Sequence, residues 1–73
     1  SGGDDIDAQL LAADVEALQG NWSACFNRLI DAVRQSAGDD RERARTRIVE
    51  LFSVAGDDSA VASARTALAS ALF

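Results

Sequence analysis

The fold is decided by residues 18–33, LQGNWSACFNRLIDAV. Gly20 follows an apolar, helix-periodic segment, and a glycine after the last helical residue adopts the left-handed conformation that ends a helix. Asn21 and Ser23 both suit the start of a second helix, because their side-chain oxygens accept backbone N–H bonds. A connection as short as Gly20 and Asn21 makes the flanking helices antiparallel neighbours. The stretch therefore predicts the turn of a helical hairpin.

Apolar residues recur at helical spacing on both sides of this turn. A first helix is expected from about Asp5 to Gln19, with a buried stripe made of Ile6, Leu10, Leu11, Val15 and Leu18. A second helix is expected from about Trp22 to Ser36, with one buried face made of Trp22, Phe26, Leu29, Ile30 and Val33. These two helices form the first predicted hairpin.

A second hairpin follows after Gly38. Asp39 and Asp40 are expected to cap a third helix that ends near Val54. The turn at 56–59 leads into a fourth helix that ends near Leu72. The expected core residues of these two helices are Ala44, Ile48, Leu51, Phe52, Ala55, Val61, Ala64, Leu68, Ala71 and Leu72. We therefore predict an all-α chain of four helices, arranged as two antiparallel helical hairpins.

The composition agrees with helices and implies a thin core. The 73 residues include 15 Ala, five Gly and no Pro. Alanine favours helix and close packing but buries little area per residue. A domain of this size is only marginally stable, so we expect a neighbour or a second copy to cover part of its surface. Residues 1–4 are interpreted as a linker or a remnant of protein expression, and residues 5–73 as one helical domain.

The charge excludes some classes of partner. The net charge is −5, and all seven basic residues are Arg. Nucleic-acid binding requires a basic surface, and anionic membranes attract basic segments, so neither partner is expected. No apolar run is long enough to span a membrane. The single cysteine, Cys25, cannot form an internal disulfide, which favours a cytoplasmic location.

The first hairpin resembles a tetratricopeptide repeat, in Ala13 and in the run Gly20-x-Trp22-x-x-Cys25-x-x-x-Leu29-x-x-Ala32. In that pattern the glycine takes the turn, the aromatic residue packs over it, and the small residue lets the helices approach. The remaining two positions continue the same face. Two residues depart from the pattern, because Gln9 and Glu16 stand where large apolar residues are usual. The spacing of the hairpins is also near the roughly 34-residue period of these repeats.

The second half resembles the last, degenerate repeat of bacterial proteins that join a thioredoxin domain to tetratricopeptide repeats. The resemblance lies in residues 48–61, IVELFSVAGDDSAV, and 67–73, ALASALF. It implies hairpins that stack as in tetratricopeptide arrays. It also implies the interaction domain of a thioredoxin-like co-chaperone, with client proteins, folding chaperones and an N-terminal thioredoxin-like domain as partners. The alternative is a purely structural module for homodimerisation or interdomain packing.

No catalytic, cofactor-binding or metal site is expected. The chain lacks His, Tyr and Lys, so acid–base chemistry would fall to carboxylates alone. Cys25 is interpreted as a core residue, with mixed-disulfide formation as the alternative. Trp22 is interpreted as packing at the turn, with a surface anchor as the alternative. Structural turn or core roles are predicted for Gly20, Trp22, Cys25, Leu29, Ala32 and Gly56.

Two features are candidate partner-binding sites. The first is the basic cluster of Arg41, Arg43, Arg45 and Arg47. Its helical spacing places Arg41 and Arg45 on one side and the other two on another. It is either a solvated face that pairs with nearby acids or a docking surface for an acidic segment. The second is the C-terminal pair Leu72 and Phe73, which either packs against the third helix or docks in a groove of a chaperone.

Overall fold

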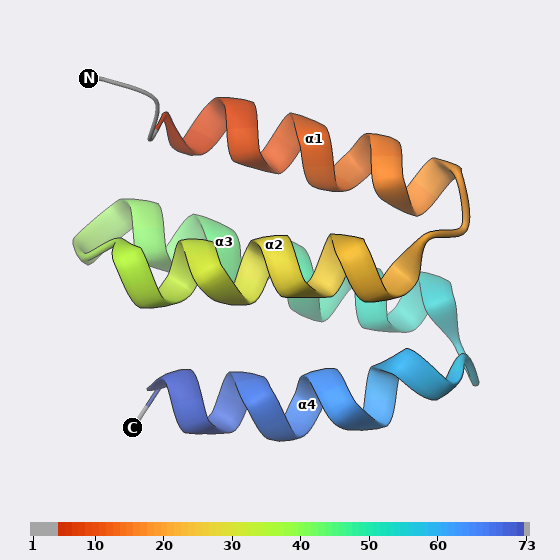
Figure 1. Ribbon diagram of the computed structural model, residues 1–73. Coiled ribbons are helices and arrows are strands. Elements are labelled where there is room, and N and C mark those ends of the chain that lie inside the picture. The colour runs from red at the N-terminus through yellow and green to blue at the C-terminus, as the bar shows by residue number, and fades with distance from the viewer. Residues whose placement is uncertain (1–4, 73) are drawn as a thin grey trace.

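The computed structural model describes residues 5–72, which form four α-helices and, over that range, no strand (Figure 1). The helices are α1 (Ile6–Leu18), α2 (Trp22–Gln35), α3 (Gly38–Ala55) and α4 (Ser59–Leu72). The predicted all-α class and the two antiparallel hairpins are confirmed. The predicted linker at 1–4 and the predicted role of Phe73 lie outside the described residues.

Helix α2 is the centre of the structure. It packs against α1, α3 and α4, and α1 also contacts α3 directly. In Figure 1, α1 and α4 lie on opposite sides of α2, and α3 lies behind it. Helices α1 and α3 run in the same direction, and α2 and α4 run in the opposite one. The hairpin of α1 and α2 therefore stacks on the hairpin of α3 and α4.

Polar side chains begin three of the helices. The Asp5 carboxylate accepts a hydrogen bond from the Asp7 backbone N–H at 3.0 Å, which caps α1. Asn21 Oδ1 accepts one from the Ala24 N–H at 3.4 Å, which caps α2. Before α4, Asp58 Oδ1 accepts one from the Ala60 N–H at 2.9 Å. Each bond satisfies a donor that the helix itself leaves without a partner.

The start of α3 differs from the prediction. Asp39 and Asp40 do not cap this helix, because it already begins at Gly38 and Ala37 occupies the cap position without a side-chain hydrogen bond. Both carboxylates lie instead in the first turn of the helix. There they favour α3 through the positive end of its dipole.

The core is built mainly by α2, which buries six residues: Cys25, Phe26, Leu29, Ile30, Ala32 and Val33. The other helices add three buried residues each: Ile6, Leu10 and Ala13; Ala44, Ile48 and Phe52; Val61, Ala64 and Leu68. The Phe26 ring stacks on Trp22, with centroids 5.5 Å apart, and meets the Phe52 ring edge-on at 5.0 Å. An aromatic cluster thus ties the first hairpin to the second.

The predicted buried stripe of α1 is wrong in three of its five residues. Leu11, Val15 and Leu18 are 66%, 45% and 88% exposed, respectively. The buried face uses Ala13, which is fully enclosed, and Ala17, which packs partly against the core. Small side chains at these two positions let α1 approach α2 closely, so the larger apolar residues of the adjacent face turn outward.

Candidate protein-interaction surface

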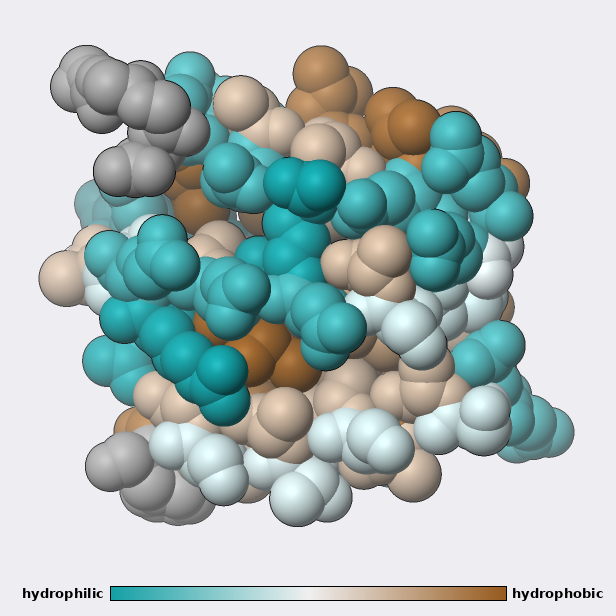
Figure 2. All heavy atoms as spheres, viewed as in Figure 1, coloured by the Kyte–Doolittle hydropathy of each residue, from teal (hydrophilic) through white to brown (hydrophobic). Residues whose placement is uncertain are grey.

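The most conspicuous surface feature is an apolar ridge on α1, formed by Leu11, Val15 and Leu18 and called here the α1 ridge. These residues stand at i, i+4 and i+7, so they share one face of the helix. Figure 2 shows hydrophobic atoms along the upper edge of the molecule, over α1. Single exposed apolar residues are ordinary, but a continuous apolar face on the solvent side of a helix is typical of an interaction surface.

Two ion pairs border the ridge on the side of α3. Arg43 pairs with Asp7, and Arg47 Nη1 lies 2.6 Å from Asp14 Oδ2. Asp7 and Asp14 each precede a ridge residue by four positions, so they are its neighbours on the helix surface. The groove between the two helices is lined by Leu10, Asp39, Glu42, Arg43, Thr46, Arg47 and Glu50. The ridge is therefore flanked by a charged groove.

The four clustered arginines do not form one free basic patch. Arg43 and Arg47 face α1, whereas Arg45 pairs with Glu42 of its own helix, with its Nε 3.0 Å from Oε1. Arg41 Nη2 reaches the carbonyl oxygens of Ala71 and Leu72 at 3.5 and 3.4 Å, at the end of α4. The hydrogen bonds from Arg45 lower the pKa of Glu42. Each of the four guanidinium groups thus has a partner within the fold.

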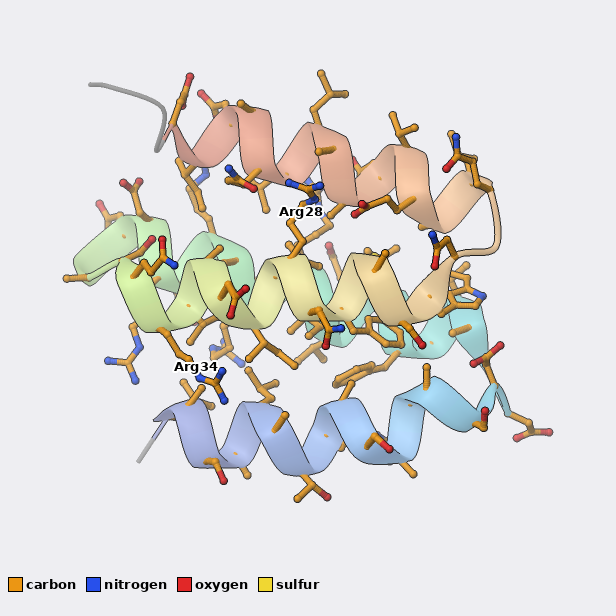
Figure 3. All side chains as sticks on the ribbon, viewed as in Figure 1. Arg28 and Arg34 are labelled. Carbon is orange, nitrogen blue, oxygen red and sulfur yellow. The ribbon has the colours of Figure 1, made fainter. Side chains whose placement is uncertain are left out.

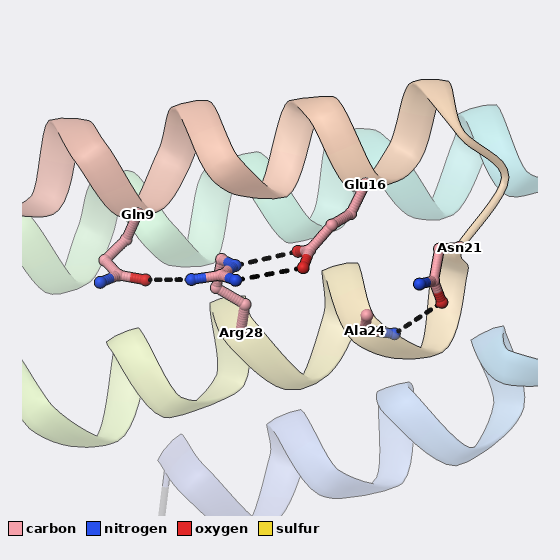
Figure 4. A network of polar contacts seen from close by, with 5 residues as sticks. All are labelled: Gln9, Glu16, Asn21, Ala24 and Arg28. Atoms are coloured by element: carbon pink, nitrogen blue, oxygen red, sulfur yellow. Dashed lines mark hydrogen bonds and ion pairs between the residues drawn. The ribbon is translucent and has the colours of Figure 1, made fainter.

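A fifth arginine, Arg28 of α2, was not singled out from the sequence. It points from α2 toward α1, whereas Arg34 of the same helix lies on the side of α4 (Figure 3). Arg28 Nε and Nη2 donate to the two oxygens of Glu16 at 2.9 and 3.1 Å, and Nη1 donates to Gln9 Oε1 at 2.9 Å (Figure 4). These hydrogen bonds lower the pKa of Glu16. One guanidinium group therefore connects two turns of α1 to α2.

A signal for this network was present in the sequence. Gln9 and Glu16 are the two residues that replace large apolar side chains of the repeat pattern, and they stand seven positions apart on one face of α1. Two polar side chains placed on a packing face require a polar partner on the facing helix. Arg28 is the basic residue of α2 that faces this side of α1.

Changing Arg28 to Ala is expected to lower the free energy of unfolding by about 1 kcal/mol, because a two-pronged, partly buried ion pair is lost. In a domain of this size that corresponds to roughly 4–8 °C in Tm. Arg34→Ala is the matched control, since its exposed ion pair with Asp31 spans 3.8 Å and such pairs contribute little. Thermal unfolding followed by circular dichroism compares the two. Equal losses would contradict a special role for Arg28.

The contribution of Glu16 should also depend on pH. Its pKa is lower in the folded protein than its ordinary value, because Arg28 donates to the carboxylate. A depressed pKa stabilises the fold at pH values above the unfolded pKa, about 4.3, and this stabilisation is lost as the pH falls through the folded pKa. The difference in stability between wild type and Arg28→Ala should therefore be full at neutral pH and shrink in acid. Urea denaturation at a series of pH values measures it.

The turn and core residues predicted from the sequence lie within the first hairpin, except Gly56, which lies in the turn between α3 and α4. Gly20 and Gly56 have φ angles of 75° and 65°, in the left-handed region that other residues rarely adopt. Cys25 and Leu29 are fully buried, and Ala32 is buried. Trp22 is half-buried and stacked on Phe26. Burial, followed by the nearby carboxylates of Glu16 and Asp14, raises the pKa of the Cys25 thiol to about 11.

No helix within residues 5–72 is long and apolar enough to cross a membrane. The same residues contain no group of three or more His, Cys, Asp or Glu side chains placed to hold a metal ion. At the end of α4, Leu72 is half-buried and packs against the core.

Comparison with known proteins places the chain among helical repeats. A family model described as "Tetratricopeptide repeat" matches residues 1–73. The uncharacterized proteins Rv1324 of Mycobacterium tuberculosis and Mb1359 of Mycobacterium bovis are each 48% identical to it over 71 residues. The match covers 96% of this chain but 23% of each relative, so the chain spans about a quarter of their length. No solved structure matches the chain significantly.

Proposed function

The chain belongs to the tetratricopeptide repeat family, and from that premise we infer that it acts as a non-catalytic protein-interaction domain that binds through the α1 ridge. The observation that carries the proposal is the exposure of Leu11, Val15 and Leu18 on one side of α1. A thin core leaves this domain little stability to spare. Large apolar side chains kept in water on one helix face are therefore best explained by a partner that covers them.

The finer proposal is that the domain belongs to a thioredoxin-like co-chaperone, located in the cytoplasm, and binds client proteins or folding chaperones. The resemblance of residues 48–61 and 67–73 to the last repeat of such proteins supports it. The relatives are about four times as long as the matched region, which leaves room for a further domain. Unfolded clients expose apolar side chains, and an apolar ridge gains free energy by covering them.

The predicted partner-binding residues take unequal parts in this proposal. We propose that Arg41, Arg43 and Arg47 join helices and that Arg45 supports its own helix, because each already has an intramolecular partner. None of the four is then proposed to dock an acidic partner. For Leu72, we propose internal packing, since it is half-buried against the core. For Phe73, the proposed role is docking to a chaperone.

The second candidate function is structural, and it is supported by the greater length of the relatives. The chain covers 23% of each relative, so another part of a longer protein, or a second copy, is also able to cover the ridge. In that case the domain would serve interdomain packing or homodimerisation and would not bind clients.

The double variant Leu11→Gln/Leu18→Gln is expected to lose most of the ability of the chain to suppress aggregation of a chemically denatured model protein after dilution. Light scattering follows the aggregation. Gln has nearly the helix propensity of Leu, and exposed positions contribute within about 0.5 kcal/mol to stability, so the variant should keep its helix content. Val49→Gln is the matched control, because Val49 is 45% exposed but lies on α3, off the ridge.

Two outcomes would count against client binding. Undiminished suppression by the double variant would exclude the ridge as the binding surface. No suppression by the wild type, together with a dimer in sedimentation velocity that the double variant abolishes, would establish the structural function instead.

A further inference from the structure

We propose that the partner of the α1 ridge is an apolar protein segment flanked by basic residues, a cationic amphipathic segment of another chain. The inference rests on the proposed function and adds the chemical class of the partner. Its charge is opposite to that of the acidic segment considered as one alternative for the arginine cluster. The difference follows from how the fold distributes its charges around the ridge.

The charged side chains of helix α1 are all acidic, and arginines of α2 and α3 neutralise them. Its charged residues are Asp7, Asp14 and Glu16, and its N-cap is the exposed Asp5. Asp7 and Asp14 are neutralised by Arg43 and Arg47, and Glu16 by Arg28. The arginines that come nearest to α1 are thereby already paired with carboxylates of the fold.

The groove beside the ridge keeps carboxylates that are weakly matched. Asp39 and Glu50, both from α3, line it. Glu50 Oε1 is 3.7 Å from Arg47 Nε, and the same arginine already makes the shorter contact with Asp14. Glu42 is held by Arg45. The lining residues and their ion-pair partners together comprise five carboxylates and three arginines, a net charge of −2. The carboxylates are Asp7, Asp14, Asp39, Glu42 and Glu50, and the arginines are Arg43, Arg45 and Arg47.

These charges select among the occupants of the ridge. A second copy docked through its own ridge would bring two acidic grooves toward each other, and such like-charge contacts are unfavourable. An acidic segment would meet Asp39 and Glu50 with its own carboxylates. A segment with apolar residues over the ridge and Lys or Arg over the groove satisfies both surfaces. Charge complementarity therefore favours the cationic amphipathic segment.

Synthetic peptides test the proposal directly. Three labelled probes share one length: a Leu stripe flanked by Lys, the same stripe flanked by Glu, and a scrambled version of the Lys peptide. Fluorescence anisotropy with the chain as it stands measures their affinities. The Lys-flanked peptide should bind at least about tenfold more tightly than the Glu-flanked peptide, and its affinity should fall as NaCl rises from about 50 to about 300 mM, because screening weakens exposed charge pairs.

Two variants separate the apolar and the ionic contributions. Leu11→Gln/Leu18→Gln should abolish binding of the Lys-flanked peptide. Glu50→Lys should weaken it by about two- to tenfold, the range expected for converting exposed attraction into repulsion. Asp57→Lys is the matched control, because it changes the net charge equally but lies in the exposed turn between α3 and α4. It should leave the affinity almost unchanged. Circular dichroism confirms that each variant keeps its helices.

The outcomes are distinguishable. Equal binding of the Lys-flanked and Glu-flanked peptides, lost in the ridge variant, would overturn the charge inference and leave the proposed function standing. Equal weakening by Glu50→Lys and Asp57→Lys would overturn it as well, because only overall charge would then matter. Failure of all peptides to bind would refute the inference. In that case the aggregation assay decides separately whether the domain binds other proteins, and sedimentation velocity decides whether a second copy covers the ridge.

Discussion

Replacing Phe26 by Ala is expected to remove most of the stability of this domain. Phe26 is 1% exposed and contacts aromatic rings from both hairpins, Trp22 at 5.5 Å and Phe52 at 5.0 Å. Truncation of a buried Phe costs about 3–5 kcal/mol, through lost transfer free energy and the cavity that remains. Small domains hold only about 5 kcal/mol in total. The variant should therefore be largely unfolded or melt far below the wild type.

Circular dichroism with urea denaturation measures this loss. Leu18→Ala is the matched control, because it also truncates a large apolar side chain, but one that is 88% exposed. That variant should change the free energy of unfolding by no more than about 0.5 kcal/mol. Similar losses in the two variants would contradict the assignment of Phe26 to the core and of Leu18 to the surface.

The second large effect is expected at Cys25. An aromatic disulfide reagent should label this thiol about two orders of magnitude more slowly in the folded protein than in the unfolded one, because a pKa of about 11 leaves little thiolate compared with the usual 8.5. Steric burial slows the reaction further, since Cys25 is fully enclosed. Labelling in buffer and in denaturant, followed by absorbance, gives the two rates.

A control variant keeps this test specific. Asn27 is exposed on the same helix, so Asn27→Cys in a Cys25→Ala background should react at nearly the unfolded rate in both conditions. Rapid labelling of native Cys25 would show that α2 opens readily or that the thiol is accessible. Either result would revive the mixed-disulfide role.

Much of the fold could be predicted because its determinants are local. The breakers Gly20 and Gly56, the cap Asn21 and the apolar period of α2 each act within a few residues of their own position. The core faces of α2, α3 and α4 were predicted for the same reason, since each of these helices has one dominant apolar face. Helix number and hairpin pairing thus followed from the sequence, whereas the start of α3 did not.

Local sequence patterns were enough to predict four helices and their order, but packing against α2 selects which face of α1 is buried. Helix α1 has two apolar faces, one through Leu10 and one through Leu11, so periodicity does not choose between them. Contact with α2 chooses the face that carries Ala13, because small side chains allow close approach. The sequence therefore predicted Leu11, Val15 and Leu18 to be buried, whereas in the fold they form the exposed α1 ridge.

The packing of the helices also determines which partners the arginines bind. Arg43 meets Asp7 across 36 positions of the chain, and Arg28 meets Glu16 across 12. Long, flexible side chains take whichever partner the packing of helices brings near, and that partner is not set by local spacing. Of the four clustered arginines, Arg43 and Arg47 pair with acids of α1. The other two bind Glu42 of α3 and the last carbonyl oxygens of α4, so the run does not form a free basic patch in the fold.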